Sequence, residues 1–205
     1  MVGPRPWGWH QLKPEWAEAL VADASIPRGA VVLDIGAGNG AITEPLLRTG
    51  ARVIAVEAHP GRAALLRDRF GGDIVVVEAD AADLRLPKQP YYVVANPPFG
   101  VSAALLRRLL QPGSRLFTAR LILQHQVARR WATADAPGAA RWSNDFETSL
   151  GRRIPRARFQ SATARRHTRP SHTAAQVDVY ASRSVRAARR LVMCTVRARP
   201  GGGFR

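Results

Sequence analysis

The sequence predicts an α/β fold, a doubly wound, Rossmann-like arrangement in which helices cover both faces of a mainly parallel sheet. Short apolar runs rich in β-branched residues alternate with helical patterns through the first 135 residues. These runs are nearly continuous, as in strands that are buried on both faces. A glycine-rich turn directly follows the first run, which is typical of a nucleotide-binding α/β domain.

The expected elements follow the hydrophobic pattern in chain order. Strands are predicted at 30–35, 52–57, 74–78, 91–95 and 115–123, and helices near 14–24, 41–49, 60–69, 102–110 and 124–133. Pro14 and Pro60 suit a first helical turn, and Ser102 suits an N-cap. Because parallel strands need a crossover between them, strands that alternate with helices predict parallel pairing.

The pattern changes after a break rich in Pro, Gly and Ala at 134–140. Residues 146–150, 176–182 and 190–196 each predict a strand, and together an antiparallel C-terminal part. The Arg-, Ala-, Thr- and Pro-rich sequence at 152–173 has no periodicity, so we expect it to be poorly ordered when free. We therefore predict one domain over residues 1–160 and an Arg-rich, partly irregular C-terminal extension over 161–205.

The net charge of +16 is concentrated near the C-terminus. Residues 1–150 carry 17 Lys and Arg against 14 Asp and Glu, whereas residues 151–205 carry 14 Arg against one acid, Asp178. Such a basic segment favours a polyanionic partner such as RNA. Specific positioning of RNA and general attraction for any polyanion are equally open.

Cysteine content and hydropathy indicate the compartment. A single Cys194 excludes an intramolecular disulfide and any zinc site built from cysteines. The first ten residues are too polar and too broken by Pro and Gly for a signal peptide, and no apolar run approaches a membrane span. We expect a cytoplasmic monomer without membrane contact or metal.

The glycine-rich turn reads Asp34-Ile-Gly-Ala-Gly-Asn-Gly40 and follows the first strand. Glycines let the backbone pass close to a ligand. The spacing G-x-G-x-G differs from the G-x-G-x-x-G of dinucleotide sites. Glu44, just inside the next helix, is an unfavourable neighbour for a pyrophosphate but not for a cationic sulfonium ligand.

Two further acidic positions follow the next strands. Glu57 ends the second strand 21 residues after Gly36, where a carboxylate can accept hydrogen bonds from both hydroxyls of a ribose. Asp80 follows the third strand and can accept an adenine amino proton, while Ala81 leaves room for the ring. A tight turn with helix-capping acids remains the alternative for each element alone, but all three at successive strand ends favour a nucleoside ligand.

The turn Asn96-Pro97-Pro98-Phe99 follows the fourth strand at the same edge. Two consecutive prolines fix the backbone, remove two N–H donors and leave carbonyl acceptors. Asn96 Oδ1 and the Pro97 carbonyl can accept hydrogen bonds from an amino group on a flat ring, and Phe99 can stack on that ring. A rigid loop with a buried Phe99 is the alternative.

Over about residues 7–160 the chain resembles the S-adenosylmethionine-dependent rRNA adenine-N6 methyltransferases, most closely the erythromycin-resistance (Erm) enzymes. The segments that carry the resemblance are GWHQL, VVLDIGAGNGAITEPLL, ARVIAVEAHP, EADAADL, VVANPPFGVSAALLRRLL, LILQHQVARRW and LGRRIPRARF. The resemblance implies a class I methyltransferase fold with S-adenosyl-L-methionine as cofactor. It further implies transfer of methyl to N6 of an adenosine in the peptidyl-transferase region of 23S rRNA, with macrolide, lincosamide and streptogramin B resistance.

The resemblance also assigns site residues. The catalytic candidates are Asn96, Pro97, Phe99 and Phe159; the cofactor-binding candidates are His10, Gly36, Ala37, Gly38, Glu57, Asp80, Ala81 and Asn96; the RNA-binding candidates are Arg152, Arg153, Arg156 and Arg158. A packing role for His10 remains equally open. After Phe159 the family continues into a small helical domain, for which this Arg-rich sequence has no room.

Three other functions remain open. A 16S rRNA dimethyladenosine transferase shares the chemistry. An NAD-dependent oxidoreductase shares the fold, although the glycine spacing differs and the Asn-Pro-Pro-Phe turn has no role in it. A non-catalytic rRNA-binding or assembly factor would use the basic residues alone.

Overall fold

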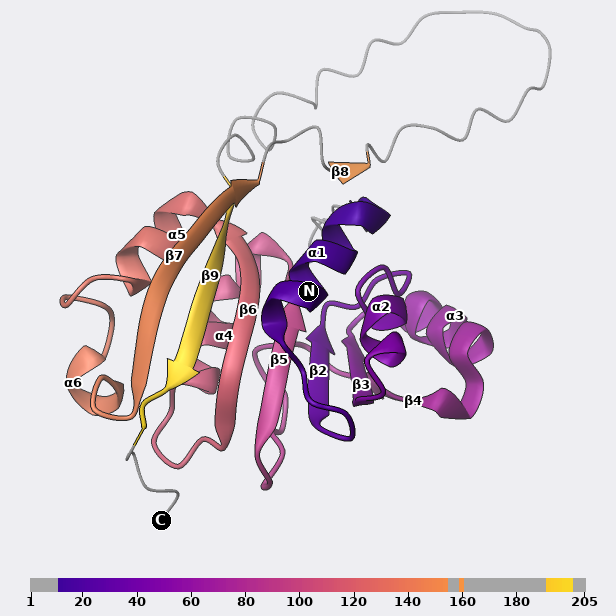
Figure 1. Cartoon of the computed structure of the whole chain (residues 1–205), viewed down its shortest axis with the longest axis horizontal. Coiled ribbons are helices and arrows are strands. Elements are labelled where there is room, and N and C mark those ends of the chain that lie inside the picture. The colour runs from indigo at the N-terminus through magenta and orange to yellow at the C-terminus, as the bar shows by residue number, and fades with distance from the viewer. Residues whose placement is uncertain (1–10, 155–158, 161–190, 201–205) are drawn as a thin grey trace, which may run out of the picture.

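The computed structural model describes residues 11–154, 159–160 and 191–200, and it contains a seven-stranded sheet with helices on both faces (Figure 1). The strands are β1 (Gln11–Leu12), β2 (Val31–Ile35), β3 (Arg52–Glu57), β4 (Ile74–Glu78), β5 (Tyr91–Ala95), β6 (Leu116–Gln124), β7 (Phe146–Ile154), β8 (Phe159–Gln160) and β9 (Leu191–Ala198). The helices are α1 (Pro14–Ala24), α2 (Thr43–Arg48), α3 (Pro60–Phe70), α4 (Ser102–Leu109), α5 (His125–Trp131) and α6 (Ala139–Trp142), with 3₁₀ turns η1 (Gly71–Asp73) and η2 (Phe99–Val101).

The strand order in the large sheet is β4-β3-β2-β5-β6-β9-β7. The first five strands in this order pair in parallel, and β9 pairs antiparallel with both β6 and β7. The order reverses between β2 and β5, which are adjacent in the sheet although β3 and β4 separate them in the chain. Such a switch point is where open α/β sheets bind ligands, beyond the carboxyl ends of the strands.

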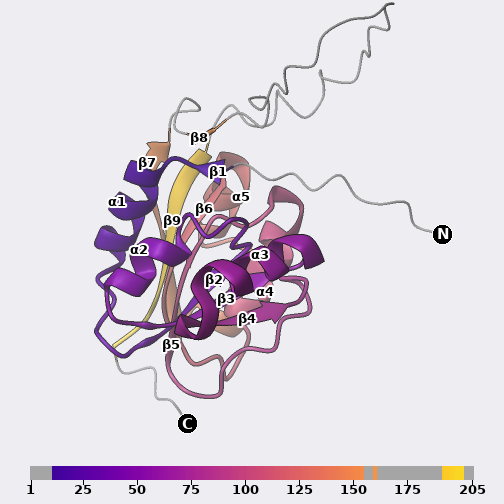
Figure 2. The same ribbon diagram turned by 90° about the vertical axis from the view of Figure 1, so that its right-hand side faces the viewer.

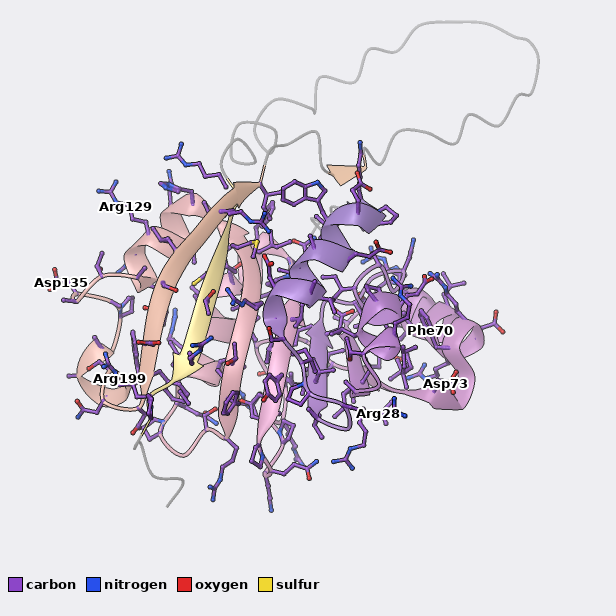
Figure 3. The ribbon with its side chains drawn as sticks, in the orientation of Figure 1. Arg28, Phe70, Asp73, Arg129, Asp135 and Arg199 are labelled. Atoms are coloured by element: carbon purple, nitrogen blue, oxygen red, sulfur yellow. The ribbon has the colours of Figure 1, made fainter. Side chains whose placement is uncertain are left out.

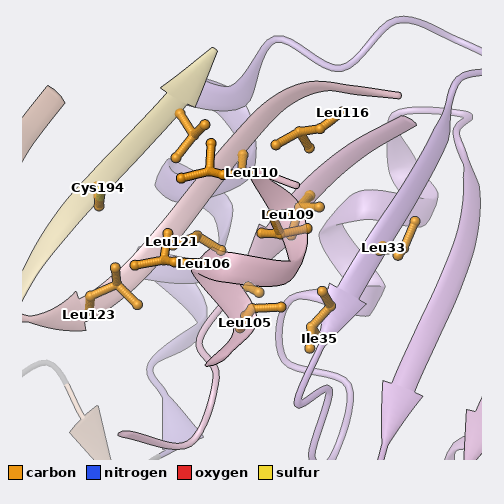
Figure 4. Close-up of a cluster of buried hydrophobic side chains, with 14 of the residues drawn as sticks. Leu33, Ile35, Leu105, Leu106, Leu109, Leu110, Leu116, Leu121, Leu123 and Cys194 are labelled. Atoms are coloured by element: carbon orange, nitrogen blue, oxygen red, sulfur yellow. The ribbon is translucent and has the colours of Figure 1, made fainter. Parts of the chain in front are cut away.

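Two apolar clusters hold the helices on the sheet. Helices α1, α2 and α3 contribute to a cluster on one face, with Leu20, Leu46 and Leu66 among its buried members. Helices α4 and α5 pack on the other face. There, Leu105, Leu106 and Leu109 of α4, and Leu110 directly after it, lie against β6 and β9 (Figure 4). In Figure 2, α1 and α2 lie on one side of β6 and β9, and α4 and α5 lie on the other. Within the described ranges, no helix combines the length and apolar character that crossing a bilayer requires.

The predicted doubly wound fold is confirmed, and the five parallel strands lie within one residue of their predicted bounds. The C-terminal strands 146–150 and 190–196 are confirmed as β7 and β9, whereas 176–182 lies outside the described residues. The expectation of poor order was wrong for residues 152–154, which continue β7 because Arg153 and Ile154 pair with β9. Because β7 and β6 both run antiparallel to β9, β7 itself runs in the direction of the parallel strands. The division of the chain at residue 160 stays a prediction, although β9 beyond it completes the sheet.

One local expectation was wrong. Ser102 is the first residue of α4 rather than its N-cap, and Val101 occupies the cap position with no side-chain cap bond. The buried Ser102 hydroxyl instead donates a long hydrogen bond of 3.5 Å to the Pro98 carbonyl. The helix therefore begins directly out of the Asn-Pro-Pro-Phe turn, which fixes where that turn lies.

Candidate cofactor and substrate site

The two motifs that stand apart in the sequence are in direct contact at the switch point. The glycine turn follows β2, and Asn96-Pro97-Pro98 follows the neighbouring β5. A Cβ added at Gly36 would lie 3.0 Å from Pro98 Cδ, 3.4 Å from Pro97 Cα and 3.6 Å from the Asn96 carbonyl oxygen. A ligand at one of these turns is therefore next to the other.

The conformation of the glycine turn is set by its backbone hydrogen bonds. The N–H groups of Gly36 and Ala37 both donate to the Val56 carbonyl, at 2.8 and 3.1 Å. Gly36, Gly38 and Gly40 have φ of +78°, +60° and +83°, in a region that side-chain-bearing residues rarely adopt. The positive φ makes glycine the residue type that the turn requires at each of the three positions.

The third glycine serves packing rather than ligand approach. A Cβ at Gly40 would lie 2.5 Å from the Phe70 ring and 3.3 Å from Leu66 Cδ2, both on α3. The Arg69 guanidinium lies 4.9 Å from the centroid of the Phe70 ring, which is labelled in Figure 3, and donates a hydrogen bond of 2.8 Å to the Asn39 carbonyl. Helix α3 therefore fixes the position of the end of the turn at Asn39 and Gly40.

Glu57, at the carboxyl end of β3, is the buried anion of the site. It is 4% exposed, and its Oε2 accepts a hydrogen bond of 2.9 Å from the Gly38 N–H. Its Oε1 accepts a hydrogen bond of 2.8 Å from the His59 N–H and lies 3.7 Å from Arg62 Nη1. Each carboxylate oxygen has a second lone pair, so Glu57 can still accept hydrogen bonds from ribose hydroxyls.

Asp34 supports the turn from beneath and is completely buried. Its Oδ2 accepts a hydrogen bond of 2.7 Å from the Thr43 hydroxyl, which ties β2 to the start of α2. Oδ1 has no hydrogen-bond partner in the part of the chain that the structure describes. Burial raises the pKa of Asp34 to about 7; the Thr43 hydrogen bond opposes this rise, and the nearby charge of Glu57 adds to it.

The role expected for Glu44 is not supported. Its carboxylate is exposed and forms ion pairs with Arg69 and, at 3.5 Å, with Arg48. These cations offset its charge, so Glu44 is a poor reason to prefer a sulfonium ligand over a pyrophosphate. The geometry of Glu57 and of the Asn-Pro-Pro turn carries that preference instead.

The two proline carbonyls of the Asn-Pro-Pro-Phe turn differ: that of Pro98 is hydrogen-bonded within the turn, and that of Pro97 is available to a ligand. The Pro98 carbonyl accepts the Val101 N–H at 3.1 Å and so helps to form η2. Among the described residues, no hydrogen bond is recorded to the Pro97 carbonyl, which remains an acceptor. Pro97 is buried, and the half-buried Phe99 packs against the cluster that α1 and α2 form.

The remaining predicted site residues differ in burial, and some of them lie outside the described residues. Asp80 is exposed after β4, its Oδ1 accepts the Ala82 N–H at 2.9 Å, and Ala81 is buried. The backbone of Phe159, in β8, pairs with Leu12 of β1. His10, Arg156 and Arg158 lie outside the described residues.

The two described arginines of the predicted RNA-binding group lie near the end of β7. Arg152 donates a hydrogen bond of 2.7 Å to Asp23 of α1 and is therefore already paired, whereas Arg153 is exposed and forms none of the ion pairs in the described ranges. β7 lies at the edge of the sheet, three strands away from β5. Neither arginine therefore lies at the switch point itself.

Several residues of the site were not expected from the sequence. Thr43, Arg62 and Arg69 hold Asp34, Glu57 and the glycine turn. Thr43 could have been found as a hydroxyl at a helix start one turn beyond a glycine loop. Arg62 and Arg69 are two of many arginines on exposed helices, and no local pattern separates them from the others.

The residues present fit S-adenosylmethionine. The buried carboxylate of Glu57 has unused acceptor capacity at the end of β3, and the adjacent turn has no side chain at Gly36 or Gly38. The Asn-Pro-Pro turn in contact with Gly36 provides neutral oxygen acceptors rather than cations. A cationic ligand with a nucleoside part matches this set of donors and acceptors.

Comparison with solved structures defines the class. The structure of the 23S rRNA methyltransferase ErmE superposes with a TM-score of 0.69 at 22% identity, covering 92% of this chain and 70% of that one. The fold is therefore that of the class I methyltransferases. The chain belongs to the ribosomal RNA adenine dimethylase family, whose sequence model matches residues 13–144.

Curated relatives carry names from two branches of this family. An rRNA adenine N-6-methyltransferase of Corynebacterium diphtheriae is 36% identical over 132 residues, 63% of this chain and 52% of that protein. The mycinamicin-resistance protein MyrB of Micromonospora griseorubida is 36% identical over 132 residues, 62% and 42% of the two chains. A ribosomal RNA small subunit methyltransferase A of Synechococcus sp. (strain JA-3-3Ab) is 34% identical over 192 residues, 83% and 69%. The chain spans about half the length of the first two relatives.

Proposed function

We propose that the protein transfers a methyl group from S-adenosyl-L-methionine to N6 of an adenosine in 23S rRNA, in the peptidyl-transferase region, and thereby gives macrolide, lincosamide and streptogramin B resistance. The observation that carries the proposal is the contact between Gly36 and the Asn96-Pro97-Pro98 turn. This contact supports the proposal because the turn assigned to the nucleoside of the cofactor lies directly beside the turn assigned to the amine of the substrate. Family membership supports rRNA adenine as the substrate class.

Each residue of the proposed site has a separate role in binding the cofactor or the adenine. Glu57, held by the Gly38 and His59 N–H groups, accepts hydrogen bonds from the ribose of the cofactor. Asn96 Oδ1 and the Pro97 carbonyl accept hydrogen bonds from the adenine amine and reduce the delocalisation of its nitrogen lone pair into the π-system of the ring, so that the lone pair can attack the methyl group. Phe99 stacks on the base, and Phe159 covers its other face. When bound, S-adenosylmethionine supplies an electrophilic methyl group on a sulfonium.

The target adenosine must leave its stack to reach this edge of the sheet. Base flipping costs a few kcal/mol, least for a nucleotide in an unpaired loop. Because the prolines fix the turn before the base arrives, the acceptors need no reorganisation when it binds. A single-stranded or loop adenosine is therefore the favoured target.

Methylation of 16S rRNA is the second candidate. The small subunit methyltransferase A of Synechococcus aligns with more of this chain, 83%, than the other two relatives do. Resistance is instead the function in the name of MyrB, and the segments LILQHQVARRW and LGRRIPRARF resemble the Erm enzymes. The two candidates share every residue of the site described above.

The deciding experiment supplies the purified chain with labelled S-adenosylmethionine and either naked 23S or naked 16S rRNA. We expect label in 23S rRNA, and N6-methyladenosine or N6,N6-dimethyladenosine in the labelled fragment by mass spectrometry. Transfer to 16S rRNA alone would select the second candidate. Transfer to neither would reject both.

Asn96→Ala separates catalysis from RNA binding. The change removes one acceptor of the amine, so we expect methyl transfer to fall at least tenfold, the loss that about 1.4 kcal/mol of transition-state stabilisation corresponds to. RNA affinity, measured by filter binding, should change less than twofold. Absence of methyl transfer in both the parent and the variant, together with unchanged RNA affinity of the variant, would favour the non-catalytic binding factor.

A further inference from the structure

One face of the sheet is left open by the described helices. Helix α1 packs over Ile122 of β6 and Met193 of β9. Beyond these residues, in the direction of the amino end of β6, Figure 1 shows no described helix in front of β6, β9 and β7. Side chains from these three strands project from this surface in Figure 3.

The strand registers identify which side chains share this face. Tyr92, Thr118, Arg197 and Glu147 are successive cross-strand partners along β5, β6, β9 and β7. The next row, two residues further along each strand, consists of Val94, Arg120, Thr195 and Ser149. Cross-strand partners lie on the same face. Val94, Thr118 and Thr195 are buried within these rows. The accessible members, together with Phe117, form what we call the open-face patch: Tyr92, Phe117, Arg120, Glu147, Ser149 and Arg197.

An aromatic pair forms the apolar part of the open-face patch. Phe117 is 45% exposed, and its ring centroid lies 5.0 Å from that of Tyr92 at an interplanar angle of 43°. The register between β5 and β6 shifts at Tyr91/Tyr92, which leaves Phe117 at an irregularity. An aromatic ring on a polar sheet surface offers a face on which a base can stack.

Two arginines form its charged part. The half-buried Arg120 donates a hydrogen bond of 2.6 Å to the Thr195 hydroxyl, and its Nε is buried without an acceptor among the described residues. Neither Arg120 nor the exposed Arg197 takes part in any ion pair in the described ranges. Glu147, the cross-strand partner of Arg197, is the single acid in the two rows. The patch therefore has excess positive charge.

We propose that the open-face patch binds single-stranded RNA, with a base stacked on Phe117 and Tyr92 and phosphates at Arg120 and Arg197. The patch lies toward the amino ends of the parallel strands, opposite the two turns at their carboxyl ends. It therefore holds RNA that flanks the reacting nucleotide. Exposed aromatics with arginines on a sheet are a combination that binds RNA strands. A second copy of the chain fits less well, because each copy carries a net charge of +16.

The test measures the affinity of the full chain for a labelled single-stranded RNA by fluorescence anisotropy at several salt concentrations. Phe117→Ser removes the exposed ring and should weaken binding about fivefold or more, as expected for one lost base stack. Arg197→Gln should reduce the magnitude of the log–log salt slope by about 0.7. The matched controls are Leu65→Ser, an apolar residue 58% exposed on α3, and Arg141→Gln on α6. Neither should change affinity or slope.

Circular dichroism and the melting temperature establish that each variant is folded. Phe117→Ser and Arg197→Gln variants that bind like their controls would overturn the proposal. So would a dimer in sedimentation that Phe117→Ser dissociates without loss of RNA affinity, because the face would then join two copies. RNA binding by the patch rests on rRNA as the proposed substrate class but not on methyl transfer. If the variants show these binding differences and no methyl transfer is detected, the proposed function is rejected and RNA binding by the patch still holds.

Discussion

At the scale of the residue, Gly36 links the cofactor turn to the substrate turn. Its positive φ and its contact with Pro98 are separate requirements for glycine. Gly113 has nearly the same φ, +77°, but a Cβ there would have no atom within 4 Å. A substitution at Gly113 therefore introduces backbone strain alone, whereas the same substitution at Gly36 also disturbs the contact between the two turns.

Gly36→Ala should abolish measurable cofactor binding, whereas Gly113→Ala should leave it unchanged. Both changes incur about 1–2 kcal/mol for a side chain in the left-handed region. Only the change at Gly36 also pushes the Asn-Pro-Pro turn away from the glycine turn. Calorimetry with S-adenosylhomocysteine and urea unfolding measure the two effects, and equal affinities for both variants would show that the contact is unimportant.

Asp34 should make stability depend on pH. The folded chain holds its proton up to a pKa of about 7, whereas the unfolded chain releases it near 3.8. The free energy of unfolding should therefore fall as pH rises from about 4 to about 7, by at most about 1.4 kcal/mol per pH unit. Asp34→Asn stays neutral and should lose this contribution. Urea unfolding at pH 5 and pH 8 tests it, and parallel pH profiles for the two proteins would exclude Asp34 as the cause.

The sequence predicted where the site residues lie, but it did not predict the contacts that hold them in place. Gly36, Glu57 and Asn96 each follow a strand or end one, so alternation of strands and helices was enough to place them at one edge. The contact between Gly36 and Pro98 depends on β2 and β5 being neighbours, which strand order decides and local pattern does not. Arg69 reaches Asn39 from 30 residues away, a pairing that no periodicity indicates.

At the scale of the element, β9 joins the two parts of the sheet. It pairs with β6 over Thr118–Gln124 and with β7 over most of its length. The apolar run 190–196 predicted a strand, but its neighbours could not be predicted, because antiparallel insertion between two strands involves residues far apart in the chain. α6 was not expected either, since residues 134–140 read as a Pro/Gly/Ala break.

The reactivity of the Cys194 thiol measures whether β9 stays paired in the sheet. It is buried between Leu121 of β6 and Leu150 of β7, and burial raises the pKa of its thiol to about 12. A neutral, covered thiol does not react, so Ellman's reagent at pH 8 should label the native chain only as β9 opens. It is the chain's single cysteine, and urea-unfolded protein gives the full signal. Rapid labelling of native protein would mean that β9 is not held in the sheet.

At the scale of the whole molecule, charge rather than shape distinguishes the C-terminal quarter. Residues 151–205 carry 14 Arg and one acid, whereas the first 150 residues are nearly balanced. Binding of naked rRNA should therefore weaken steeply with salt. If Arg152, Arg153, Arg156 and Arg158 all contact phosphates, the log–log slope for a single strand is at least about 2.8 in magnitude. A slope below about 1 would exclude this group as the RNA anchor.

The position of β9 also has a consequence for synthesis. β6 and β7 do not pair with each other, and the strand that joins them is made last among the described elements. A nascent chain that has emerged only to Ile154 presents an unpaired edge of β6 to solvent, and such edges promote association with other chains. Translation must therefore pass Ala198 before the edge of β6 can be covered, so an association-prone edge persists until the last described strand has been made.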